Sequence, residues 1–167
     1  MARKKAEEKL NLDSILFKCR DILRQARNSG SFFEKRDMML TLVFLRFMGE
    51  KFEDGIENLR RTLVDQGLDP DNEEIWNAFF NDPTFTDGTY NLPVEARWST
   101  IINTPAPQLN VALDTALKAL GDSDKQLKGC FVEGTFTTRN LEPKDIKMLV
   151  DEINKISHKQ FGEEKDL

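Results

Sequence analysis

Side chains able to contact phosphate are concentrated in the first third of the chain. Arginines and lysines recur between residues 18 and 36, and the adjacent phenylalanines Phe32 and Phe33 lie among them. Cations paired with aromatic rings suit a nucleic-acid surface, where Lys and Arg neutralise phosphates. The alternative is a solvated helix face with core phenylalanines and a packed tryptophan. The candidate contacts to a DNA backbone are Lys18, Arg20, Arg24, Arg27, Lys35, Arg36 and, beside Trp98, Arg97.

The distribution of charge also places a possible nucleic-acid surface in the first third of the chain. The net charge of −5 is the sum of three unequal parts. Residues 1–61 hold 14 Lys/Arg against 10 Asp/Glu, a net charge of +4. Residues 62–96 hold 8 acids and no base, and the remainder has 10 bases against 11 acids. A nucleic-acid surface is therefore expected in the first third and not around residues 65–95.

Residue patterns that perform catalysis elsewhere are missing. The chain has no glycine-rich dinucleotide or P-loop motif, no H-E-x-x-H and no G-x-S-x-G. Its one histidine, His158, has no cysteine or second histidine near it in sequence. The acids Asp71, Glu73 and Glu74 could bind a cation, but carboxylates at such a loop-to-helix junction typically cap the helix. We expect no catalytic, metal or cofactor-binding residue in this chain.

Three further features have structural interpretations. Cys19 and Cys130 are isolated, so neither a zinc site nor a disulfide is indicated, and both are interpreted as small core residues. The stretch "NDPTF", residues 81–85, looks superficially like a methyltransferase adenine loop but is interpreted as a turn. The charged start "MARKKAEEKL" has no signal sequence, and the apolar run at 38–48 is too short to cross a membrane. These features predict a cytoplasmic protein.

The elements that must position the cations are predicted to be helices. An apolar stripe with helical spacing covers residues 12–27, and the sequence "NSG" at 28–30 stops it. Ser31 and Glu34 form a capping-box pair, which predicts a second helix from about Phe32 to near Val64. Gly49 and Gly55 are places where this helix could break. The face opposite the first stripe carries Lys18, Arg20, Arg24 and Arg27.

The second predicted helix should be the centre of the fold. Its residues 38–48 are apolar on almost every side, so other helices must cover them, whereas the part after Phe52 is apolar on one side only and should be peripheral. Further helices are predicted around 73–80, after Pro93, within 105–122 with Gly121 past the end, and within 141–157 with Pro143 in the first turn. Residues 127–140 should be extended or irregular. The fold class is therefore mainly α: a single compact multi-helix bundle around a buried central helix, with irregular connections.

The order of these segments resembles a known family. The stretches "FKCRDILRQA", "RDMMLTLVFLRFMGEKFED", "NLPVEARWSTI", "LNVALDTALKAL", "LKGCFVEGTF" and "LEPKDIKMLVDEINKIS" resemble the N-terminal helical domain of the modification (methylase) subunit of Type I restriction-modification systems. The resemblance covers about residues 12–160. Residues 1–11 are then a charged, mobile N-terminus, and residues 161–167 a tail leading toward an absent methyltransferase domain.

The resemblance implies a role in assembly. In this family the helical domain precedes a domain that uses S-adenosylmethionine to methylate the N6 of adenine, so the parent subunit would be an adenine-specific DNA-methyltransferase. The implied partners are DNA, through its backbone, and the specificity subunit, second modification subunit and restriction subunit of the same system. The helical domain would help to clamp DNA and would bind no cofactor itself.

A second hypothesis comes from a different class of protein. The chain would be a stand-alone helical module that binds only protein. It predicts no DNA binding at moderate salt, whereas the first hypothesis predicts weak, salt-sensitive and sequence-independent binding.

Overall fold

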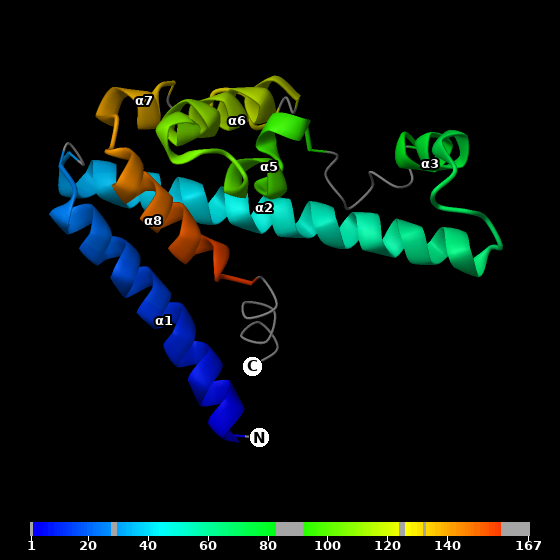
Figure 1. Cartoon of the computed structure of the whole chain (residues 1–167), viewed down its shortest axis with the longest axis horizontal. Helices are drawn as coiled ribbons and strands as arrows, with labels where there is room; N and C mark the ends of the chain where they lie inside the picture. The colour runs from blue at the N-terminus through cyan, green and yellow to red at the C-terminus, as the bar shows by residue number, and fades with distance from the viewer. Residues whose placement is uncertain (1, 28–29, 83–91, 124–125, 132, 158–167) are drawn as a thin grey trace.

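The longest helix, α2 (Phe32–Asp65), runs through the middle of the molecule, and the other helices are arranged along it (Figure 1). The computed structural model describes residues 2–27, 30–82, 92–123, 126–131 and 133–157, with side chains from residue 12 onward. In the segment 38–48 of α2, Leu40 is the one exposed residue. The prediction of a central helix covered on several sides is therefore confirmed.

A capping box begins α2. The Ser31 hydroxyl accepts a hydrogen bond from the backbone N–H of Glu34, and the Glu34 carboxylate accepts one from the N–H of Ser31 at 2.6 Å. These two bonds satisfy N–H groups that the first helical turn leaves without partners. The helix then continues without a break, so neither Gly49 nor Gly55 interrupts it.

Two helices cover one side of α2. The helix α1 (Ala2–Gln25) diverges from the start of α2, and α8 (Pro143–Asn154) lies between them, as Figure 1 shows. The buried stripe of α1, including Ile15, Cys19 and Leu23, joins the stripe of α8 in one core. The helix α1 begins ten residues before the predicted position 12, because "ARKKAEEK" consists of residues with high helix propensity.

The other side of α2 is covered by α5 (Trp98–Ile102), α6 (Leu109–Ser123) and α7 (Thr135–Arg139), together with the 3₁₀ turns η1 (Val94–Ala96) and η2 (Ala106–Gln108). The carboxylate of Asp114 in α6 accepts hydrogen bonds from the backbone N–H groups of Phe136 and Thr137, at 3.0 and 2.8 Å. These bonds hold the first turn of α7 against α6.

Two predictions about this side are corrected. Gly121 lies inside α6 and not past its end, since the helix continues to Ser123. The segment 127–140 contains the helix α7, although its β-forming residues favoured extended structure, because Asp114 and the burial of Phe136 select the helical turn. No strand occurs in the parts of the chain that the structure describes, so the prediction of a mainly α fold is confirmed.

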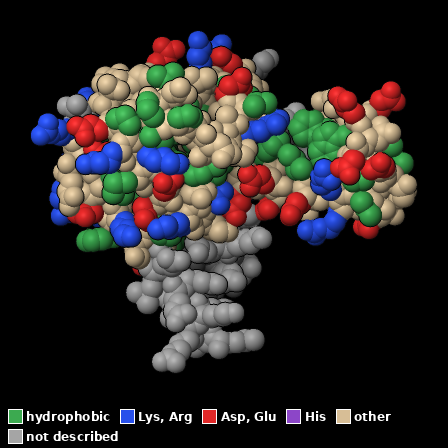
Figure 2. All heavy atoms as spheres, in the orientation of Figure 1, with side chains coloured by type: hydrophobic (Ala, Val, Ile, Leu, Met, Phe, Trp, Pro, Cys, Tyr) green, Lys and Arg blue, Asp and Glu red, His purple; other side chains and the backbone are tan. Residues whose placement is uncertain are grey.

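The far end of α2 carries a separate feature, which we call the arm: the last turns of α2 with α3 (Glu73–Phe80) folded back on it. Asn72 caps α3, and the ring of Phe80 meets that of Phe52 at a centroid distance of 6.2 Å. No residue of α3 is buried. Figure 2 shows both carboxylates and cations over this arm, and carboxylates are in excess. Beyond Arg60 and Arg61, residues 62–82 include six acids and no base: Asp65, Asp69, Asp71, Glu73, Glu74 and Asp82.

The cysteines separate into two environments. Cys19 is buried, as predicted, but Cys130 is exposed, so its prediction as a core residue is wrong. Cys130 lies in a turn whose neighbouring residues Lys128 and Gly129 are also exposed, whereas Cys19 lies on the buried stripe of α1. His158, the tail 161–167 and most of "NDPTF" lie outside the described residues. Among the helices that are described, none has the length and apolar character to cross a membrane.

Candidate nucleic-acid interface

Four of the seven predicted cations line one groove between α1 and α2. Arg20 and Arg24 come from α1, and Lys35 and Arg36 come from the first turns of α2. The groove has a volume of about 390 Å³, and its apolar lining is supplied by Leu23, Phe32 and Met39. We call it the basic groove. The spacing of its residues explains the grouping, since positions three, four and seven apart share one helix face.

The charge of the basic groove is uncompensated within its walls. No carboxylate is among the residues that line it, and in the described part of the chain Arg20, Arg24 and Lys35 have no ion pair. Arg36 lies 3.7 Å from the carboxylate of Asp37, but both side chains are at least half exposed, so this pair is weak. The groove is therefore a site of positive potential on a molecule whose net charge is −5.

Two aromatic rings lie near these cations: Phe32 lines the basic groove, and Phe33 lies outside its lining but contacts Phe32 and Arg36. Phe32 is 65% exposed and Phe33 is 63% exposed, so the alternative that they are core phenylalanines is wrong. Their ring centroids are 5.8 Å apart with the planes nearly perpendicular. The guanidinium of Arg36 lies 5.2 Å from the centroid of Phe33. Cations and exposed aromatic faces are thus adjacent at the start of α2.

Glu34 holds this start of α2 in place. Besides its bond to Ser31, its carboxylate forms an ion pair with Arg139 at the end of α7. The hydrogen bond from the backbone N–H of Ser31, followed by the charge of Arg139, lowers the pKa of Glu34. The carboxylate is therefore ionised at neutral pH, and it fixes the first turn that carries Phe32 and Lys35.

The remaining predicted cations lie elsewhere. Lys18 and Arg27 line a different cavity, between α1 and α8, among several carboxylates. The Lys18 ammonium is 3.6 Å from Glu152. The Nε of Arg97 donates to the carbonyl of Leu92 at 3.1 Å, and its guanidinium lies 4.6 Å from the Phe52 ring centroid. Trp98 is buried and donates to Asn154 at 2.7 Å, so its interpretation as a packed tryptophan is confirmed.

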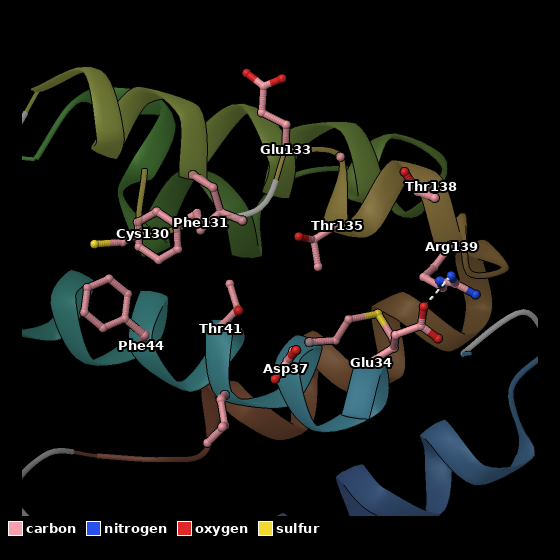
Figure 3. A pocket seen from close by; sticks show the side chains of 14 residues that line it. Glu34, Asp37, Thr41, Phe44, Cys130, Phe131, Glu133, Thr135, Thr138 and Arg139 are labelled. Atoms are coloured by element: carbon pink, nitrogen blue, oxygen red, sulfur yellow. Dashed lines mark hydrogen bonds and ion pairs between the residues drawn. The ribbon is translucent and has the colours of Figure 1, made fainter. Parts of the chain in front are cut away.

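A cavity of about 560 Å³ on another face is lined mainly by acidic rather than basic charged side chains (Figure 3). It lies between the first half of α2 and the segment 130–139, and its carboxylates are Glu34, Asp37 and Glu133. Arg139 is the cation in its lining, and Figure 3 shows that guanidinium directed at Glu34. Because its carboxylates would repel phosphate, this cavity is not a candidate for nucleic acid.

The acids considered for metal binding are used structurally. Asp71 forms an ion pair with Arg60 at 3.1 Å, and Glu73 and Glu74 occupy the exposed first turn of α3. Among the described residues, no group of three potential ligands is close enough to hold a metal ion. Leu23 and Met39, which line the basic groove, were not predicted as site residues. The periodicity of α2 could have identified Met39, seven residues after Phe32 on the same face.

Comparison with known proteins adds one finding. The family model described as the HsdM N-terminal domain matches residues 12–153, which is most of the chain. No curated protein and no solved structure matches the chain. The matched range contains the basic groove, the central helix α2 and the arm.

Proposed function

The chain belongs to the HsdM N-terminal domain family, the N-terminal region of the methylase subunit of Type I restriction-modification systems, and from this premise we propose that it clamps DNA and joins subunits. On this proposal the full subunit methylates the N6 of adenine with S-adenosylmethionine in the cytoplasm. This chain contributes no catalytic group. Its partners are the DNA backbone and the specificity, second modification and restriction subunits of the same system.

The basic groove is the observation that carries the DNA-binding part of the proposal. Its four cations come from two helices and have no carboxylate beside them in the groove. Lys and Arg contacts to phosphate supply affinity and orientation but no sequence information. The domain would therefore hold DNA of any sequence and leave recognition of the target to another subunit.

The first prediction concerns the charge of the basic groove. The triple variant Arg20→Glu, Arg24→Glu, Arg36→Glu should bind a labelled DNA duplex at least ten times more weakly, as measured by fluorescence anisotropy. Each reversed arginine would lose its phosphate contact, and this loss lowers the affinity for DNA. Each lost contact should also reduce the magnitude of the slope of log K against log salt by about 0.9. The wild-type slope should accordingly be about −3 to −4 if all four cations contact phosphate.

A matched triple on other faces controls for net charge. Lys118, Lys128 and Lys144 are exposed and lie outside the basic groove, and their reversal to Glu changes the charge by the same amount. This variant should keep most of the affinity. Equal losses in both triples would show that net charge, and not the groove, governs binding. A wild-type chain that binds no DNA at moderate salt would favour the protein-only module instead.

A further inference from the structure

We propose that the basic groove takes unpaired nucleotides, with its cations on the phosphates and the rings of Phe32 and Phe33 stacked on bases. The inference rests on the proposed DNA binding and specifies which form of DNA fits. It predicts a preference for single strands, or for duplexes with unpaired bases, over continuous duplex.

Both rings are largely exposed to solvent beside the cations. Backbone contact with duplex DNA requires cations only, because a duplex presents sugars and phosphates outward and keeps base faces stacked inside. Yet nearly two thirds of each phenylalanine faces solvent immediately beside the cations. An unpaired base offers a free π-face, and stacking on an aromatic side chain buries both surfaces. The apolar component of the site therefore matches a single strand better than a duplex.

The two rings are arranged to take separate bases. Their planes are inclined by 80°, so one base cannot stack on both, and each ring is suited to a different base. Arg36 lies over Phe33, and 63% of Phe33 nevertheless remains exposed to solvent. Phe32 lines the same groove as Arg20, Arg24 and Lys35, so a base stacked on its ring would bring the adjoining phosphates near these cations.

The groove has little means of selecting among bases. The proposal assigns the arginines and the lysine of the groove to phosphates, and the other side chains that line it, Leu23, Phe32 and Met39, are apolar and carry no group that could pair with a base edge. Stacking tolerates every base, since each has a π-face. The groove should therefore accept single strands with little dependence on sequence.

The test uses the full chain with a labelled thymine oligonucleotide and a duplex of equal strand length, at the same salt. The wild type should bind the single strand about fivefold or more tightly than the duplex. The double variant Phe32→Ala, Phe33→Ala should weaken single-strand binding about tenfold or more and change duplex binding less than twofold. Phe32→Tyr, Phe33→Tyr should retain the preference.

A control pair comes from exposed valines outside the groove. Val64 and Val111 are about as exposed as the phenylalanines, and their replacement by alanine should leave both affinities unchanged. Thermal unfolding of the phenylalanine variant should match that of the wild type, because exposed rings contribute little to the core.

Three results would overturn the inference. Unchanged single-strand binding in the alanine variant would remove the stacking role, while the proposed function would stand if charge reversal still weakened duplex binding. Equal weakening of single strand and duplex would give the rings a merely structural role. Self-association of the wild type that the alanine variant abolishes, measured by sedimentation velocity, would assign the surface to a second copy instead.

Discussion

Cys19 and Cys130 have very different chemistry because of where the chain places them. Cys19 in α1 is fully buried where α1 packs against α8. Burial, aided by the charge of Glu152, raises the pKa of its thiol to about 12. Cys130 is exposed, and its thiol donates to the carbonyl of Gln126 at 3.4 Å. Since the thiolate is the reactive form and reagents need access, the native chain should present one reactive cysteine.

Thiol labelling at pH 8 tests this prediction. A disulfide reagent such as DTNB should modify one thiol per native chain within minutes and both thiols in concentrated urea. Cys130→Ser should abolish the fast reaction, and Cys19→Ser should leave it unchanged. Rapid modification of two thiols in the native protein would show that α1 separates from α8 far more often than the buried contact implies.

At the same residue scale, the sequence indicated which cations could contact phosphate but not how the fold groups them. All seven cations were identifiable, yet only those at 20, 24, 35 and 36 share a groove. Arg27 falls outside because α1 ends at Gln25, and Lys18 points toward Glu152 of α8. The residue at which a helix ends, and the side chains that it contacts on other helices, depend on tertiary structure. Local periodicity does not predict them.

At the scale of elements, the close contact between α2 and α5 depends on Gly49. A Cβ at this position would lie 2.5 Å from the Cβ of Trp98 and 3.1 Å from its backbone nitrogen. Neither group is the flexible end of a side chain, so one helix would have to move. The sequence suggested Gly49 as a break in α2, whereas the structure uses it for a close approach.

Gly49→Ala should therefore destabilise the protein by about 1–2 kcal/mol, because overpacking costs about 1–3 kcal/mol and the better helix propensity of alanine returns up to about 1 kcal/mol. Urea unfolding followed by circular dichroism measures this change. Gly121→Ala is the matched control, since its nearest neighbours would be 3.9 Å away, and it should stabilise by about 0.5–1 kcal/mol. If both variants shifted stability in the same direction, the contact with Trp98 would not be the cause.

Local signals explain why most element boundaries were predictable. Ser31 with Glu34 marked the start of α2, and Pro143 marked the first turn of α8. The segment around α7 was not predictable, because its helical turn depends on Asp114, more than twenty residues earlier. Sequence patterns thus located helices that local signals mark, such as a capping box or a first-turn proline, and failed where a distant side chain holds the first turn.

At the scale of the whole molecule, α2 separates two regions of opposite charge. With 34 residues it is about 50 Å long, with the basic groove at its start and the six carboxylates of the arm at its end. Such a separation would orient an approaching polyanion toward the groove and away from the arm. The sequence showed both charge blocks, but their distance depends on α2 continuing unbroken past Gly49 and Gly55.

The arm and the bundle should also differ in local stability. The bundle contains the continuous core around α2, whereas α3 has no buried residue and is attached through a few side-chain contacts. The Phe80 ring meets that of Phe52 in α2 with centroids 6.2 Å apart, and Arg60 of α2 lies 5.7 Å from the Trp76 ring. These contacts are partly exposed, so opening the arm costs much less free energy than unfolding the bundle.

Hydrogen exchange followed by mass spectrometry measures this difference directly. Amides of α3 should exchange well before those of α8, whose stripe of Ile146, Leu149 and Val150 is fully buried. Trp76→Ala should accelerate exchange in α3 and leave α8 unchanged, because the two helices share no contact that the substitution removes. Matching exchange rates in the two helices would mean that arm and bundle open as one cooperative unit. In that case the acidic end of α2 would be held as rigidly as the basic groove, and charge separation along α2 would persist in every native state.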